Sequence, residues 1–369
     1  MMKNCIFEKL LKKSKNLYKK IKAKRLKWLY IKCRIEFDGK PFTPILQNKI
    51  KEMLRRSQSI YLYDDSQAKY LADSWKGMLC KPSKLRFIEN AVPVVLSANE
   101  AYAPYMAVML QSLIDNSSQL RKYHFMIFER NFTDKIKSYL INQVSKFPHC
   151  EIDFINVEMA FDGIPIIPPA SSAYVSIDTF SRFFIPYWLD NYSKVIYCDC
   201  DMFAKADIAD LFDLNIQDYS MAACISPFAN QNLKNMRYSN LLATSIFLLL
   251  DNWSRYLNAG VLVFDTKKFK EKYSYQDCFK LAIYYTNRYR IRYDDQDVLA
   301  LLVKDDYFPL PPEWNYSWLM PGTDKCKILH YISSLKPWKN IPEIANNLDV
   351  LTYRNYASNI PLFNEIGVK

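Results

Sequence analysis

The stretch Val195-Ile196-Tyr197-Cys198-Asp199-Cys200-Asp201 carries both a fold signal and a chemical signal. Its first four residues form an apolar run that is typical of a buried strand. Asp199 and Asp201 follow where this strand runs into a loop, so both carboxylates can turn toward one hard cation such as Mg²⁺ or Mn²⁺. In α/β sheets, ligands usually bind at the carboxyl ends of strands. Short acidic pairs also occur as solvated turn residues, so both interpretations stay open at this point.

The sequence on the amino side of this stretch alternates strand and helix patterns. Strand patterns at 92–98, 124–128 and 151–157 are separated by a helical pattern at 105–115 and by a second helix that 131–134 can cap. This alternation predicts an α/β fold with parallel strands. The other predicted elements are a helix at 179–189, strands at 221–225 and 258–265, a helix beginning at 294, and a wrapping segment rich in Pro and Trp at 309–338.

Composition sets broad limits on the class of protein. The chain has 369 residues, half of them apolar, and only six glycines, which indicates a substantial packed core in one large domain or two small ones. Its nine cysteines are irregularly spaced and contain no C-x-x-C pair. This pattern suggests neither a zinc site nor a disulfide framework, and it favours reduced thiols in a cytosolic protein.

The excess positive charge is confined to the amino-terminal arm. Residues 1–34 contain thirteen Lys and Arg against the single acid Glu8, whereas the remainder has 37 basic and 37 acidic residues. Apolar and aromatic residues interleave with the lysines at roughly helical spacing, which is typical of a basic amphipathic helix on an anionic membrane surface. The alternatives are a solvated helix packed on its own domain, or an arm that meets nucleic acid. The neutral remainder offers no basic groove, which argues against nucleic acid.

Hydropathy argues against a membrane-spanning protein. No segment reaches the ~18 uncharged apolar residues that a transmembrane helix needs. The amino-terminal segment lacks the apolar stretch and cleavage site of a secretory signal. We therefore expect a cytoplasmic protein, and a peripheral one on the inner face of the cytoplasmic membrane if residues 1–34 bind lipid.

Several short motifs occur in a fixed order along the chain. They are Leu96-Ser97-Ala98-Asn99-Glu100-Ala101-Tyr102, Ser181-Arg182-Phe183, Asp199-Cys200-Asp201, Asn258-Ala259-Gly260-Val261, Asp294-Asp295-Gln296-Asp297, and His330 six residues before Lys336-Pro337-Trp338. Over about residues 91–340 this ordered set resembles the retaining glycosyltransferases of family 8, which include bacterial lipopolysaccharide galactosyl- and glucosyltransferases and glycogenin.

The resemblance implies a fold and a domain organisation. The implied fold is GT-A, a nucleotide-diphospho-sugar-binding α/β domain with a Rossmann-like mixed, mainly parallel sheet flanked by helices. The chain would then comprise a basic, mainly helical extension at 1–90, the GT-A domain at 91–340 and a carboxyl-terminal tail at 341–369.

The resemblance also implies a metal site. Asp199, Asp201 and His330 would bind Mn²⁺ or Mg²⁺, and two carboxylates with an imidazole suit Mn²⁺. Lys336 would place a positive charge on the phosphates of a sugar nucleotide. The alternatives are a structural histidine and a solvated lysine. The family usually has glycine three residues after the histidine, whereas this chain has Ser333.

Further positions match the donor-binding residues of the family. Ser97, Asn99 and Tyr102 match the segment that grips the nucleobase and ribose, and Cys200 falls among the donor-binding positions. Here the chain departs from the family, because Asn99 and Glu100 stand where acids are frequent. A simple strand-to-helix turn is the alternative for this segment.

The remaining matches concern the sugar. Arg182 would contact the donor near the diphosphate and sugar, with a structural ion pair as the alternative. Asn258 and Asp295 would face the sugar, and Asp295 would bind its hydroxyls. Gln296 would lie beneath the anomeric carbon, where an amide is a poor nucleophile but can stabilise positive charge. Asp297 would cap and position its helix.

Together these features predict a metal-dependent retaining glycosyltransferase. It would transfer a hexose, galactose or glucose, from a UDP-sugar to a hydroxyl of a surface glycan such as lipopolysaccharide or capsule. The alternative is a sugar-nucleotide-binding or glycan-assembly protein that has lost catalysis. The sequence specifies neither the sugar nor the oligomeric state.

Overall fold

The computed structural model describes most of the chain beyond residue 63. The described residues are 64–77, 81–82, 85–165, 177–227, 250, 252–289 and 294–366. The basic arm at 1–34 lies outside them, so its predicted helix and membrane binding remain predictions. None of the helices in the described part has the length and apolar character that a bilayer crossing requires.

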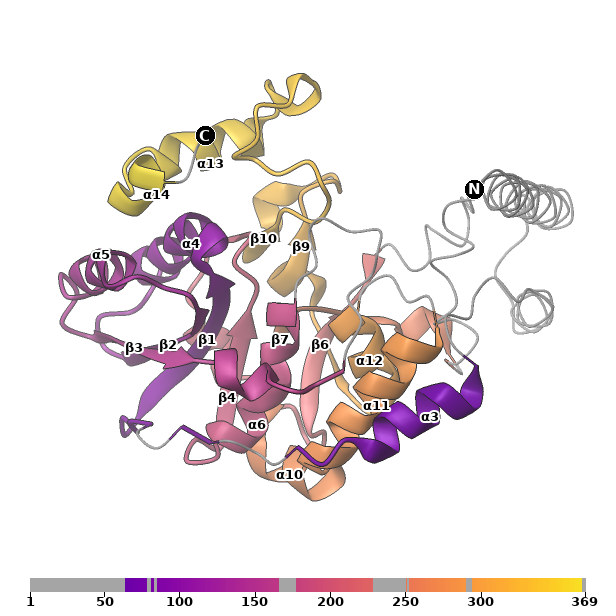
Figure 1. Ribbon diagram of the computed structural model, residues 1–369. Coiled ribbons are helices and arrows are strands. Elements are labelled where there is room, and N and C mark those ends of the chain that lie inside the picture. Colours follow the sequence, from indigo (N-terminus) through magenta and orange to yellow (C-terminus); the bar gives the residue numbers. More distant parts are fainter. Residues whose placement is uncertain are drawn as a thin grey trace, which may run out of the picture.

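A mixed sheet forms the centre of the molecule (Figure 1). Within the described residues it has seven strands in the order β3-β2-β1-β4-β7-β6-β8. They are β1 (Ala91–Asn99), β2 (Lys122–Arg130), β3 (Cys150–Asn156), β4 (Lys194–Cys198), β6 (Met221–Ile225), β7 (Leu257–Asp265) and β8 (Phe308–Leu310). β1 pairs in parallel with β2 and β4, and β2 with β3, which confirms the parallel arrangement predicted for this half. β7 is antiparallel to both β4 and β6.

Helices cover both faces of the sheet. Alternate residues of β1 point to opposite faces, so Val94 and Leu96 join one buried cluster and Val95 joins the other. The helices on the Val94 side are α4 (Ala103–Asp115), α5 (Asp134–Val144), α7 (Ala209–Phe212), α13 (Leu348–Ala357) and α14 (Pro361–Ile366). Those on the Val95 side are α3 (Asp65–Ser74), α6 (Ile185–Trp188), α10 (Thr266–Lys272), α11 (Tyr275–Arg288) and α12 (Asp294–Val303).

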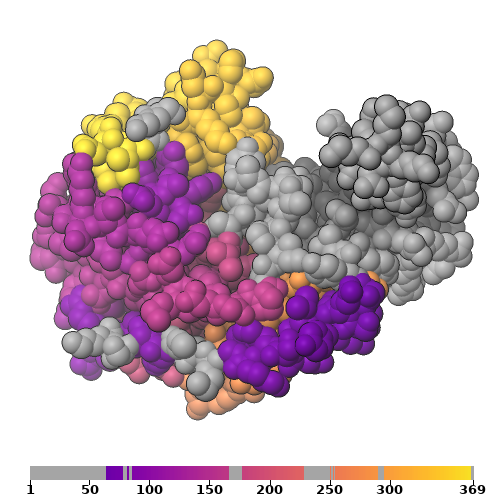
Figure 2. All heavy atoms as spheres, viewed as in Figure 1, coloured from indigo at the N-terminus to yellow at the C-terminus, as the bar shows by residue number. Residues whose placement is uncertain are grey.

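The ends of the described chain pack on this core. Val350, Tyr353 and Leu362 of the two last helices are buried in the α4 cluster, and Figure 2 shows these yellow helices lying against the purple and magenta surface. At the other end, α3 lies on α11, where Tyr284 donates a 2.6 Å hydrogen bond to Asp65. The six cysteines within the described ranges are buried and free.

A second, small sheet brings distant parts of the chain together. Among the described residues its order is β5-β10-β9, formed by β5 (Met202–Ala204), β10 (Ile328–His330) and β9 (Tyr316–Ser317). β10 runs antiparallel to β5 with His330 opposite Met202. The backbone N–H of Tyr331 donates to the carbonyl of Asp201 at 3.0 Å. This pairing places His330 beside the end of β4.

The predicted helix at 179–189 is present in two parts. A 3₁₀ helix (Ile177–Phe184) runs directly into α6. Pro186 lies in the first turn of α6, where its missing N–H leaves no hydrogen bond unmade. Phe180, Phe183 and Phe184 are buried, so this segment anchors the arginine between them in the core.

Candidate active site

Asp199, Asp201 and His330 meet at the carboxyl end of β4. The imidazole Nε2 of His330 lies 3.2 Å from Asp201 Oδ1 and 4.0 Å from Asp199 Oδ2. One ligand atom from each of the three residues lies within 4.8 Å of the others. The structure therefore brings together the three residues that the sequence predicts as metal ligands.

This donor set fits a divalent cation. Two ligand atoms about 2.1 Å from an octahedral ion and at right angles to each other are separated by about 3 Å, close to the His330–Asp201 distance. Carboxylate oxygens with one imidazole suit Mn²⁺ or Mg²⁺. The other imidazole nitrogen, Nδ1, lies 2.8 Å from Asn315 Oδ1, which leaves Nε2 facing the carboxylates.

Lys336 lies buried against the same carboxylates. Its ammonium group donates hydrogen bonds to Asp201 Oδ2 and, at 2.9 Å, to the carbonyl of Tyr331. Burial disfavours the charged form of Asp201, but the positive charge of Lys336 and the neighbouring His330 outweigh it and hold the pKa of Asp201 well below its usual range. Lys336 is thus not a solvated lysine, and the site keeps an ionised carboxylate.

Arg182 bridges two carboxylates from different elements. Its Nη2 lies 3.0 Å from Asp199 Oδ1, and its Nε lies 3.0 Å from Asp295 Oδ2. Its Nη1 donates to the carbonyl of Ala259 at 2.5 Å, and the guanidinium lies 4.5 Å from the ring centre of Tyr197. Burial raises the pKa of Asp295, and Arg182 only partly offsets this. The buried arginine therefore has the partners that its charge requires.

Gln296 is held at both ends of its amide. Its Oε1 accepts from the backbone N–H of Ala259 at 3.1 Å, and its Nε2 donates to the hydroxyl of Tyr256 at 2.7 Å. That hydroxyl donates to Asp297 Oδ1 at 2.5 Å. The first turn of α12 thus presents Asp295 toward Arg182 and fixes Gln296 against β7, while Asp297 anchors the turn through Tyr256.

Ser97, near the end of β1, contacts Cys200, which lies between the two carboxylates after β4. Ser97 Oγ accepts from Ser181 Oγ at 2.6 Å, and the Cys200 thiol donates to the Ser97 carbonyl at 3.0 Å. Burial raises the pKa of this thiol well above its usual value. The Cys200 side chain therefore faces the core, and its backbone is the part left to meet a ligand.

Asn99, the last residue of β1, caps the 3₁₀ turn that ends at Tyr102. Asn99 Nδ2 donates to Asp178 Oδ2 at 2.8 Å, and its Oδ1 accepts from the Tyr102 N–H at 3.3 Å. The Tyr102 ring meets Trp338 edge to face, with 6.1 Å between ring centres. The turn therefore joins the Lys336-Pro337-Trp338 segment, although the Asn99 side chain contacts Asp178 rather than the metal-ligand cluster.

Three supporting residues of the site have no recognisable signal in the sequence. Asn315 contacts His330 and Asn258, Tyr197 donates to Asp199 Oδ1 at 2.7 Å, and Tyr256 supports Gln296. Tyr197 reads as an ordinary strand residue, and Asn315 lies in a segment without periodicity. Only the long-range pairing of the chain reveals their roles.

Comparison with known proteins assigns the family. The model of glycosyl transferase family 8 matches residues 93–342. The chain therefore belongs to glycosyl transferase family 8, and its mainly parallel sheet is the GT-A fold of that family, as expected.

Individual relatives agree with this assignment. A glycosyltransferase by name from Haemophilus influenzae is 29% identical over 220 residues, covering 57% of this chain and 59% of the relative. The lipopolysaccharide 1,2-glucosyltransferase of Escherichia coli K12 is 24% identical over 161 residues, covering 39% of this chain and 44% of the relative. The galactosyltransferase LgtC, solved with donor and acceptor sugar analogues, superposes with a TM-score of 0.58 at 19% identity, covering 73% of this chain and 96% of LgtC.

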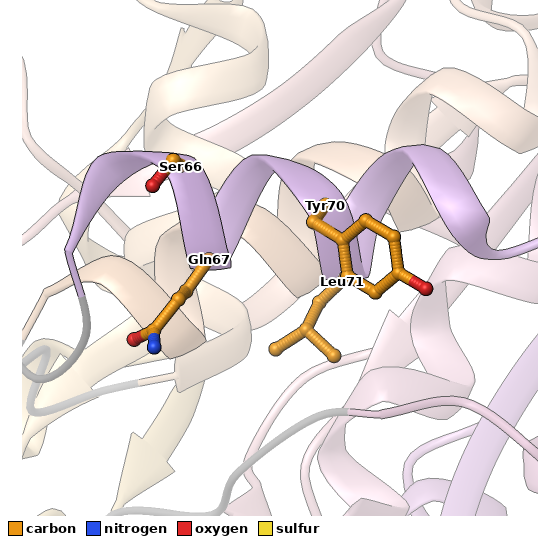
Figure 3. Close-up of a pocket in the computed structure, with 4 residues that line it drawn as sticks. All are labelled: Ser66, Gln67, Tyr70 and Leu71. Carbon is orange, nitrogen blue, oxygen red and sulfur yellow. The ribbon is translucent and has the colours of Figure 1, made fainter.

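A separate cavity borders α3. It has a volume of about 500 Å³, and Ser66, Gln67, Tyr70 and Leu71 line it (Figure 3). These side chains carry no charge, and none belongs to the predicted site. The cavity therefore has a different chemical character from the polar cluster at the end of β4.

Proposed function

We propose that this chain is a metal-dependent retaining glycosyltransferase that transfers a hexose, galactose or glucose, from a UDP-sugar to a hydroxyl of a surface glycan. The observation that carries the proposal is the convergence of Asp199, Asp201 and His330 within 4.8 Å of one another, with Arg182 and Lys336 bonded to their carboxylates. The names of the relatives, a lipopolysaccharide glucosyltransferase and a galactosyltransferase, support this substrate class.

The positive charges of the site suit a diphosphate leaving group. When bound, a divalent ion at the three ligands supplies Lewis-acid stabilisation of that group. Lys336 adds a fixed ammonium group beside Asp201 and favours charge that develops on the leaving phosphate. Arg182 holds Asp199 and Asp295 in fixed positions, so the phosphate end and the sugar end of the donor are aligned by one side chain.

The sugar would lie against α12 and β7. Asp295 would accept hydrogen bonds from its hydroxyls, and Gln296 would lie beneath the anomeric carbon. Because Gln296 is held by Ala259 and Tyr256 and is a poor nucleophile, the acceptor hydroxyl attacks from the face that the phosphate leaves. The anomeric carbon–phosphate oxygen bond breaks, the bond to the acceptor oxygen forms, and the departing phosphate takes the acceptor's proton.

The proposed location of the acceptor is inferred from the positive charge of residues 1–34. Thirteen basic residues in 1–34 would hold the enzyme on the anionic inner face of the cytoplasmic membrane, beside a glycolipid or growing glycan. Sedimentation with vesicles of anionic and of zwitterionic lipid tests this part. Binding to anionic vesicles that is lost on deletion of 1–34 is expected, and equal binding to both kinds contradicts it.

A donor panel tests the catalytic proposal. The purified chain is incubated with Mn²⁺ and UDP-, GDP- or CMP-sugars, and hydrolysis is followed by NMR, which also reports the anomer of a transferred sugar. We expect UDP-hexose turnover with retention, abolished by EDTA and by Asp201→Asn. Full activity in EDTA contradicts metal dependence. Binding of UDP-hexose without turnover across a range of acceptors identifies an inactive sugar-nucleotide-binding protein instead.

A further inference from the structure

A chain of buried amides lies behind His330. The backbone N–H of Gly260 donates to Asn258 Oδ1 at 2.9 Å, and Asn315 Nδ2 donates to the same oxygen at 2.7 Å. Asn315 Oδ1 then lies 2.8 Å from His330 Nδ1. Asn258, Asn315 and His330 are only 7%, 4% and 5% exposed, so their polar groups need hydrogen-bond partners within the protein.

The direction of every bond in this chain follows from its first member. A backbone N–H can only donate, so the atom of Asn258 that faces Gly260 is its oxygen. An amide oxygen can only accept, so Asn315 presents its NH₂ group to Asn258. Its oxygen therefore faces the imidazole, and Nδ1 of His330 must carry a proton.

This proton decides which imidazole nitrogen can bind a cation. With Nδ1 protonated, a neutral His330 has its free lone pair on Nε2, the atom that lies 3.2 Å from Asp201 Oδ1. The oxygen of Asn258 already accepts two bonds, so its amide nitrogen is the group with which Asn258 would contact a donor sugar.

We propose that Asn315 is a positioning residue of the metal site. Its oxygen holds the proton on Nδ1 of His330 and so reserves Nε2 for the divalent cation, while Asn258 and Gly260 hold its amide in this orientation. The inference rests on the metal site of the proposed function, but the state of the ring can be measured without metal.

Imidazole nitrogen NMR tests the proton position directly. The chain has only three histidines, so histidine ring-¹⁵N labelling of the metal-free protein gives few signals, and His330→Gln assigns those of His330. In wild type we expect a protonated Nδ1 at pH 8. Asn315→Leu removes the acceptor at similar volume and should move the proton to Nε2. Asn315→Asp loses the bond that Asn315 donates to Asn258 but keeps an acceptor for Nδ1, so it should keep the proton there. An unprotonated Nδ1 on His330 in the wild-type protein would overturn the proposal.

Metal affinity tests the consequence. An EPR titration that follows free Mn²⁺ measures the affinity of the protein for this ion. We expect Asn315→Leu to bind Mn²⁺ about 10- to 100-fold more weakly than wild type, and Asn315→Asp to recover most of the affinity. Asn287→Leu is the matched control, because it removes a buried amide on α11 that bonds Ile283 and Pro165. That variant should bind Mn²⁺ like wild type.

The outcomes separate the two proposals. Asn315→Leu with wild-type Mn²⁺ affinity overturns the role of Asn315 and leaves the metal site intact. A wild-type chain that binds no Mn²⁺ overturns the metal site itself, and with it the metal-directed role of Asn315, even where the NMR places the proton on Nδ1.

Discussion

Gly260 lies directly against the ring of His330: a Cβ atom built on the glycine would be 2.5 Å from His330 Cε1. Met202 Cε would be 2.6 Å from the same Cβ, so both neighbouring side chains would have to shift. We predict that Gly260→Ala displaces the imidazole and weakens Mn²⁺ binding at least about tenfold, because even small misplacement of a ligand is costly. A Mn²⁺ titration measures this.

Gly322→Ala is the control for this prediction. Gly322 has φ +88°, and a Cβ there would have its nearest neighbour 3.7 Å away. Strain at positive φ should cost about 1 kcal/mol of stability, and Mn²⁺ affinity should stay unchanged. Loss of affinity in both variants would show that general destabilisation explains the effect.

Removal of Arg182 should destabilise the fold strongly. Arg182→Met leaves Asp199 and Asp295 without their shared buried partner, which should lower the free energy of unfolding by about 3–5 kcal/mol. Arg121→Met breaks an exposed pair with Asp213 and should cost less than about 1 kcal/mol. Urea unfolding of both variants measures the difference, and equal losses would contradict a buried charge network.

Ser333 occupies a conformation that suits glycine. Its φ is +112°, in the left-handed region that favours glycine. We predict that Ser333→Gly raises stability by about 1 kcal/mol, because the relieved strain exceeds the added freedom of the unfolded chain. Ser333→Ala keeps the strain and loses the 3.1 Å bond that Ser333 Oγ accepts from Leu335 N–H, so it should lower stability. Thermal melts that give the opposite order would refute this account.

Low pH should destabilise the fold at β3, the edge strand that carries Asp153. Burial raises its pKa, but bonds from His124 and Arg86 outweigh this and hold the pKa below its usual value. A carboxylate with a lowered folded pKa stabilises above its unfolded pKa, about 4, and this contribution is lost as the pH falls through the folded pKa. Asp153→Asn should therefore cost about 2 kcal/mol at pH 7 and progressively less below about pH 4 in urea titrations. If Asp153→Asn cost the same stability at every pH, the ionised carboxylate would not be the source of the stabilisation.

Local sequence patterns predict six of the seven strands that the structure describes in the large sheet and the Asp199–Asp201 pair, but neither β8, the small sheet nor the contacts that complete the site. The run 221–225 is a strand with the predicted bounds, and the carboxylates of Asp199 and Asp201 follow β4 as expected. His330 could be assigned only through the family resemblance. Its position depends on the pairing of β10 with β5, and such long-range pairing leaves no periodic signal in either segment.

The direction of β7 is a second feature that local sequence patterns do not predict. Its apolar run at 258–265 predicts a buried strand, but periodicity does not determine whether a strand is parallel or antiparallel. The direction of β7 brings Asn258 and Ala259 to the carboxyl end of β4, where they meet Asn315 and Arg182. The Pro- and Trp-rich segment 309–338 likewise reads as a wrapping segment, yet it supplies β9, β10 and Asn315.

Crystals soaked in Mn²⁺ and measured at the manganese absorption edge test the central claim most directly. The account predicts one anomalous peak about 2 Å from a carboxylate oxygen of Asp199, a carboxylate oxygen of Asp201 and Nε2 of His330. Absence of a peak there at saturating Mn²⁺, or a peak that contacts none of these three side chains, would contradict it.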